Sequence, residues 1–107
     1  MNDLLFYIKN LVEQEYERAS EIHGKTNNSS HESYAIILEE YEEAKDCAKT
    51  FKAVFKDYWK HVKHNTSYND LIAHLQKYAV RAAAEWVQVA AMCQKAQYKK
   101  QEGSGDE

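Results

Sequence analysis

Proline is absent from the 107 residues, and only three glycines occur. Two of those glycines fall within the last seven residues, so the body of the chain has almost none of the residues that interrupt helices. Cysteine is scarce as well: Cys47 and Cys93 lie far apart and match neither a disulfide framework nor a zinc-site spacing. These shortages predict an all-α protein in which both cysteines are small buried apolar residues of helices.

A long uncharged apolar run and a positively charged leader segment are also missing, which predicts a cytoplasmic protein with no membrane partner. The net charge is −3, with acids and bases interspersed rather than gathered into a basic stripe, so we expect no nucleic-acid partner. The length suffices for one core. We therefore expect a single domain over residues 1–101 and a disordered acidic tail over residues 102–107.

The apolar residues recur at helical spacing in three segments. The first is expected to run from Asp3 to about His23. The second starts at Ser29, which forms a capping box with Glu32, and continues to about His64, with a kink after Cys47 left open. The third is expected to follow a cap formed by Ser67 and Asp70. The predicted fold is a hairpin of two long antiparallel helices plus an N-terminal helix. Its four-helix-bundle-like core is completed by dimerisation, since the three broad apolar stripes leave much surface uncovered.

Acidic side chains gather on the second and third of these helices. Glu40 and Glu43 are three residues apart, so on a helix both carboxylates project from one side, close enough to share a cation. Glu85 falls inside the apolar arc of the third helix, where an unpaired carboxylate is costly. If the two stripes pack, the acids meet, and Mg²⁺ with its oxygen ligands relieves their repulsion. Two plainer interpretations stay open: the acidic run lies in solvent, or Arg81 pairs with Glu85 one turn away.

These acids also follow the pattern of a known family. Glu39-Glu40-x-x-Glu43, followed on a later helix by Glu85-x-x-Gln88, resembles the EExxE and ExxD motifs of the all-α, MazG-like nucleoside triphosphate pyrophosphohydrolases. The resemblance covers roughly residues 29–96, and the stretches 31–40 and 88–92 look like small phage or prophage members of the family.

The resemblance implies hydrolysis of a nucleoside triphosphate, often a dNTP, to the monophosphate and pyrophosphate, a reaction that cleanses the nucleotide pool. It also implies Mg²⁺, or Mn²⁺ in its place, and a homo-oligomer, dimer or tetramer, in a bacterial or phage-infected cytoplasm. By position, the metal ligands would be Glu40, Glu43, Glu85 and Gln88. Glu39 and Glu40 would be the catalytic acids. Arg81 and Lys77 are candidates for binding phosphates, and Trp59 is a candidate for stacking on the base.

Gln88 departs from the motif, because the family has an aspartate at this position. Its amide oxygen can still coordinate a cation, but the site loses one negative charge. An acid from elsewhere, such as Asp46 or one from a second chain, would restore it. The interval between Glu43 and Glu85 is also long for the family and suggests an extended hairpin. Since a fold can persist without its chemistry, the alternative function is a catalytically inactive helical interaction or regulatory module of phage origin.

Histidines offer a second constellation that could bind a metal. His61 and His64 are three residues apart near the end of the second helix, and His74 follows the turn. Histidines at this end of a helix also interact favourably with the helix dipole, and we favour that interpretation.

Overall fold

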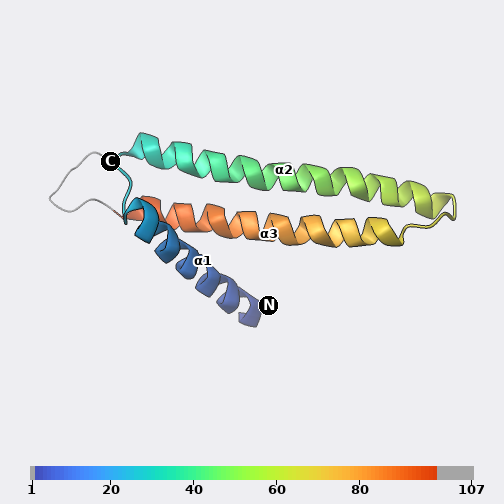
Figure 1. Ribbon diagram of the computed structural model, residues 1–107, viewed down its shortest axis with the longest axis horizontal. Helices are drawn as coiled ribbons and strands as arrows, with labels where there is room; N and C mark the ends of the chain where they lie inside the picture. The colour runs from blue at the N-terminus through green and yellow to red at the C-terminus, as the bar shows by residue number, and fades with distance from the viewer. Residues whose placement is uncertain (1, 99–107) are drawn as a thin grey trace.

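The computed structural model describes residues 2–98, and the regular secondary structure of that range is entirely helical. Helices α1 (Asn2–His23), α2 (Ser30–Lys63) and α3 (Asn69–Gln97) follow one another along the chain. Figure 1 shows α2 and α3 as an antiparallel hairpin, with α1 beside the C-terminal end of α3. The predicted all-α hairpin with an N-terminal helix is confirmed. The predicted tail, residues 102–107, lies outside the described residues.

The predicted capping box at the start of α2 is present in a modified form. The Ser29 side chain accepts a hydrogen bond from the backbone N–H of Glu32, at 3.1 Å. The Glu32 carboxylate accepts in return from the backbone N–H of Asn28, one residue before the cap. Beyond this start, α2 is unbroken over 34 residues, so the kink that the sequence left open after Cys47 is not formed.

The predicted cap of α3 is wrong. Tyr68, not Ser67, precedes the first helical residue, and no side chain caps this end of α3. The turn from α2 explains the difference, because Asn65 adopts a left-handed backbone (φ 54°) and the N–H of Thr66 donates back to the carbonyl of His61. This extended closure of α2 delays the start of α3 to Asn69.

The buried core is small and lies at one end of the hairpin. Ala19, Ala91 and Met92 are buried together, and the partly buried Val12, Tyr16, Ile36 and Ile37 pack against them. The apolar face predicted for the first helix is therefore used only in its second half, because α1 diverges from α3 toward its start (Figure 1). Every residue from 2 to 11 is exposed, including Leu4, Ile8 and Leu11.

The burial of the cysteines and the hydrophobicity of the helices are also predicted from the sequence. Cys47 and Cys93 are half-buried free thiols rather than fully buried ones. None of the described helices is both long enough and apolar enough to cross a lipid bilayer.

Candidate metal centre

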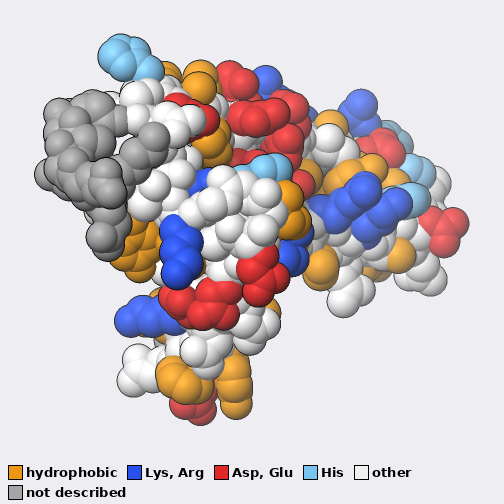
Figure 2. Space-filling view, turned by 60° about the vertical axis from the view of Figure 1, so that its left-hand side comes forward, with side chains coloured by type: hydrophobic (Ala, Val, Ile, Leu, Met, Phe, Trp, Pro, Cys, Tyr) orange, Lys and Arg blue, Asp and Glu red, His pale blue; other side chains and the backbone are white. Residues whose placement is uncertain are grey.

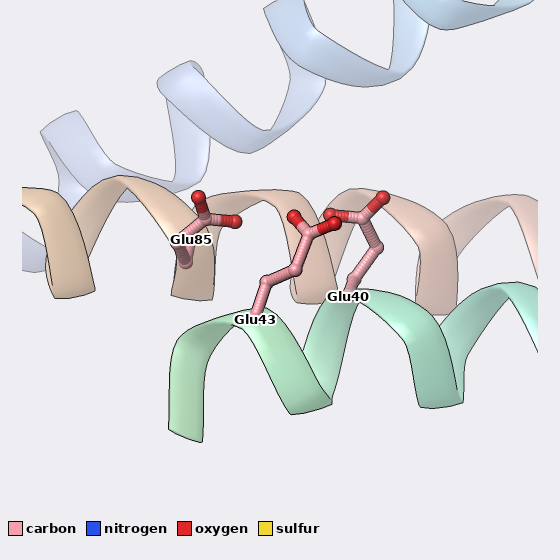
Figure 3. Close-up of side chains that lie close together, drawn as sticks. All are labelled: Glu40, Glu43 and Glu85. Atoms are coloured by element: carbon pink, nitrogen blue, oxygen red, sulfur yellow. The ribbon is translucent and has the colours of Figure 1, made fainter. Parts of the chain in front are cut away.

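Three glutamates from two helices converge near the buried end of the hairpin. Glu40 and Glu43 project from consecutive turns of α2, and Glu85 faces them from α3 (Figure 3). One carboxylate oxygen of each residue lies within 4.8 Å of the others. The sequence predicted that these side chains would meet if the two apolar stripes packed, and the structure brings them together.

The packing of α2 on α3 explains why the carboxylates come so close. Ala44, directly after Glu43, is fully buried, so α2 presents only a methyl group at the point where it contacts its neighbour. Small residues at a helix contact let the two backbones approach. The glutamates beside this contact are therefore held at its border, with Glu40 and Glu85 half-buried and Glu43 exposed.

Among residues 2–98, no ion pair neutralises the carboxylates of this cluster. Partial burial raises the pKa of Glu40, and the negative charges of Glu43 and Glu85 raise it further. Burial likewise raises the pKa of Glu85, as does the neighbouring Glu43 carboxylate, while Arg81 acts in the opposite direction. Without a metal, Glu40 and Glu85 therefore hold a proton more tightly than isolated glutamates do.

A nearby cation does not account for Glu85. In the described part of the chain, Arg18 and Glu15 are the residues that form an ion pair, and Arg81 stays beyond ion-pair distance of Glu85. The interpretation in which Arg81 satisfies Glu85 is therefore not realised. Glu85 remains a half-buried carboxylate whose nearest charged neighbours include another carboxylate.

α1 contributes an acid that sequence analysis did not single out. Glu15 pairs with Arg18, which lowers the pKa of Glu15 most, and the nearby Gln88 side chain lowers it further. The negative charge of Glu15 adds to the repulsion that raises the pKa of Glu40. Glu15 stands one turn before the buried Ala19, but only the placement of α1 shows that its charge acts on Glu40. Glu15 is not one of the three converging carboxylates.

The remaining predicted site residues lie at different distances from the three glutamates. Glu39 is exposed on α2 beside Glu40. Arg81 and Lys77 precede Glu85 by one and two turns on α3, and helix geometry places both on the side of α3 that carries Glu85. Trp59 is 16 residues beyond Glu43 along α2, about 24 Å at helical rise, so the structure does not bring it together with the cluster.

The histidines and Asp46 also stay outside this cluster. The Nδ1 atom of His61 lies 2.6 Å from the Thr66 hydroxyl, and that of His64 lies 2.8 Å from the carbonyl oxygen of Lys60. Both rings are thus engaged in the turn that ends α2. Neither they nor His74 form a metal-ligand group within residues 2–98. Asp46 is exposed and is not one of the converging acids.

The donor set fits a hard divalent cation. Oxygens bound to one Mg²⁺ at about 2.0–2.1 Å are at most about 4.2 Å apart, so side-chain rotations of less than an ångström would bring the three carboxylates into range. Three oxygen ligands leave the remaining octahedral positions for water or for phosphate oxygens. A cation would also relieve the repulsion that raises the pKa of Glu40 and Glu85.

Comparison of the chain with family models, with curated proteins and with solved structures found no match.

Proposed function

We propose that this protein is a Mg²⁺-dependent nucleoside triphosphate pyrophosphohydrolase of the MazG-like type. The observation that carries the proposal is the convergence of Glu40, Glu43 and Glu85 within 4.8 Å, with no ion-pair partner among the described residues. The spacing of these residues in the sequence follows the family motif, and the long α2–α3 hairpin supplies the interval between its two halves.

In this proposal the three glutamates hold the cation. When bound, the cation would neutralise phosphate oxygens and stabilise the charge on the leaving pyrophosphate. Glu39, exposed beside the cluster, would orient the attacking water. Arg81 and Lys77 would bind phosphate oxygens, since they follow one side of α3 toward Glu85. Mn²⁺ is expected to substitute for Mg²⁺, because both favour oxygen ligands in octahedral geometry.

Gln88 would act through Glu15 in this scheme. The Gln88 side chain lowers the pKa of the Glu15 carboxylate, and the negative charge of Glu15 in turn raises the pKa of Glu40. Glu15 thus offers, within one chain, a replacement for the charge that the motif aspartate supplies. A second chain is then not needed for the charge of the centre.

The described chain also leaves much apolar surface for a second copy. Large hydrophobic side chains that are 38–69% exposed occur on all three helices. Surfaces of this kind on small proteins are commonly interfaces. We therefore keep a homodimer with a four-helix core as part of the proposal.

Pyrophosphate release tests the function directly. Canonical and modified NTPs and dNTPs are incubated with the protein and Mg²⁺ or Mn²⁺, and turnover is compared with that of Glu40→Gln and Glu85→Gln. Glu42→Gln is the matched control, since it makes the same charge change on α2 outside the cluster. The proposal predicts metal-dependent turnover that both cluster variants reduce by at least roughly 100-fold and the control leaves intact.

Absence of turnover with every nucleotide, from a protein with native helicity, would refute the hydrolase. It would favour the inactive helical interaction or regulatory module of phage origin, in which the exposed apolar surface is the functional feature.

A further inference from the structure

The hairpin carries one continuous apolar face that the rest of the described chain leaves uncovered. Its residues recur every seven positions, which keeps them on one side of each helix. On α2 the row is Tyr34, Tyr41, Ala48, Phe55 and Val62, and on α3 it is Ile72, Ala79 and Trp86. All of them are exposed except the half-buried Val62.

The two rows join into a single surface. The rings of Tyr41 and Trp86 lie 6.0 Å apart, edge to face, and link α2 to α3. Near the turn, a cavity of about 640 Å³ opens beside the α2 row, with Phe55, Trp59 and Val62 in its lining. We call these two rows, together with Trp59, the apolar face. It runs along most of the hairpin.

The apolar face lies apart from α1 and borders the metal centre on one side. Glu43 follows Tyr41 by two residues, which turns it about 200° away around α2. The contacts of α1 fall on the last turns of α3, where Gln94 donates to Glu13 and Tyr98 packs on Tyr16. Glu40 and Glu85 each stand one residue before an aromatic of the face, about 100° around their helices, so a partner on the face would lie beside these two carboxylates and away from Glu43.

The area is sufficient for a stable pair of chains. An aromatic side chain buries about 150–250 Å², so the five half-exposed aromatics of this face offer on the order of 500 Å² per copy. Two copies would bury about 1,000 Å² from these side chains alone, the size at which specific interfaces begin. These aromatics are Tyr34, Tyr41, Phe55, Trp59 and Trp86.

Charge along the hairpin selects the orientation of the second copy. The half near the turn, residues 49–81, has seven Lys and Arg against two acids, a net charge of +5. The half near α1, residues 30–48 and 82–98, has seven acids against two lysines, a net charge of −5. The charges are thus less evenly mixed in the fold than the composition suggests. Figure 2 shows Lys and Arg side chains beside hydrophobic ones toward the end of the hairpin away from α1.

We propose that two copies pair through the apolar face with their hairpins head to tail, so that the basic half of each lies beside the acidic half of the other. This rests on the proposed dimer and is independent of the proposed hydrolase activity. Pairing with both turns at one end would instead set the two basic halves side by side, which repel. In the head-to-tail arrangement, the cavity beside Phe55 and Trp59 lies level with the start of α2 in the second copy, where Tyr34 is 69% exposed.

The first test locates the surface. Light scattering coupled to size exclusion should give twice the 12.5 kDa chain mass for the wild type. The double variant Ala79→Glu, Ala83→Glu places one carboxylate in the α3 row and a second at an exposed position one turn further along, between Ala79 and Trp86. It should weaken the dimer roughly 100-fold or more, because these charges would be buried without partners. The matched control is Ala53→Glu, Ala73→Glu, which adds the same charge at exposed positions off this face.

Circular dichroism should show unchanged helicity in both variants, since all four alanines are exposed in the single chain. A wild type that stays monomeric at every concentration would overturn the dimer and this inference together. A dimer that the Ala79→Glu, Ala83→Glu variant leaves intact would overturn the proposed surface alone.

The second test measures the orientation. Spin labels on Ser67→Cys, in a background with Cys47→Ala and Cys93→Ala, report the distance between the two turns. Head-to-tail pairing predicts a separation of about 50 Å, the length of the 34-residue α2. A separation of about 10–20 Å, one or two helix spacings, would show both turns at one end and overturn the proposed orientation while leaving the dimer standing.

Discussion

Replacing Glu43 by Gln should stabilise the metal-free protein, although it removes a charged group from a helix. Two unit charges 4.8 Å apart repel by about 0.9 kcal/mol in water and about 3.5 kcal/mol at the dielectric of a protein surface. Glu43 is exposed, so the lower value applies to its repulsion with Glu40 and with Glu85. We expect Glu43→Gln to raise the free energy of unfolding at pH 7 by about 1–2 kcal/mol.

At saturating Mg²⁺ the wild type should instead be more stable than Glu43→Gln. A ligand at 100 times its dissociation constant stabilises the folded state by about 2.7 kcal/mol, and the wild type alone retains all three carboxylates to bind it. Thermal unfolding at matched protein concentration, with EDTA and with Mg²⁺, measures both effects, since about 1 kcal/mol moves the midpoint of a domain this size by roughly 4–8 °C.

The matched control for this experiment is Glu42→Gln, which removes the same charge from the neighbouring position outside the cluster. It should change the free energy of unfolding by less than about 0.5 kcal/mol with or without Mg²⁺. A Glu43→Gln variant that is no more stable than the wild type in EDTA would refute the argument that the cluster repels itself. If Mg²⁺ raises the free energy of unfolding of Glu43→Gln as much as that of the wild type, the role of Glu43 as a ligand is refuted.

Three other predictions concern pH, capping and the motif position. The pKa values of Glu40 and Glu85 are raised in the folded state above the ordinary value of 4.5, so the folded protein binds these two protons more tightly than the unfolded chain does. The resulting stabilisation is fully present below pH 4.5 and is lost as the pH rises through the raised pKa values. Denaturant titrations without metal should therefore show a smaller free energy of unfolding at pH 7 than at pH 5. A Glu40→Gln, Glu85→Gln variant should show a smaller difference between the two pH values, and an unchanged difference would contradict this prediction. Ser29→Ala should cost about 1 kcal/mol of unfolding free energy by removing the cap of α2, whereas Ser30→Ala next to it should be nearly neutral. Gln88→Asp should tighten Mg²⁺ binding in calorimetry by roughly tenfold, since it adds a carboxylate next to Glu15; weaker binding would show that the contact between Gln88 and Glu15 matters more than the added charge.

The sequence predicts those features of the fold that depend on local or periodic signals. The absence of proline and the 3.6-residue periodicity predict three helices, and the cap at Ser29 predicts where α2 begins. The turn before α3 is different, because its closure depends on the left-handed backbone of Asn65 and on a hydrogen bond back to His61, neither of which the pair Ser67 and Asp70 reveals.

Some features of the candidate site also follow from the sequence pattern, and others depend on the tertiary structure. The meeting of Glu40, Glu43 and Glu85 follows from two amphipathic helices packing through their apolar faces, and the sequence contains both faces. The participation of Glu15 depends on the angle at which α1 leaves Ala19, which is a tertiary property. The net charges of the two hairpin halves are likewise invisible in the composition, since they appear only when α2 folds back along α3.

The central claim is that these three glutamates form one divalent-cation centre, and direct binding of Mn²⁺ tests it. Electron paramagnetic resonance of free Mn²⁺, titrated with the protein, should reveal one bound ion per chain that added Mg²⁺ displaces. The Glu42→Gln control should bind as the wild type does, and Glu85→Gln should lose the site. Equal Mn²⁺ binding by Glu85→Gln and the wild type, or no binding by either, would contradict the account.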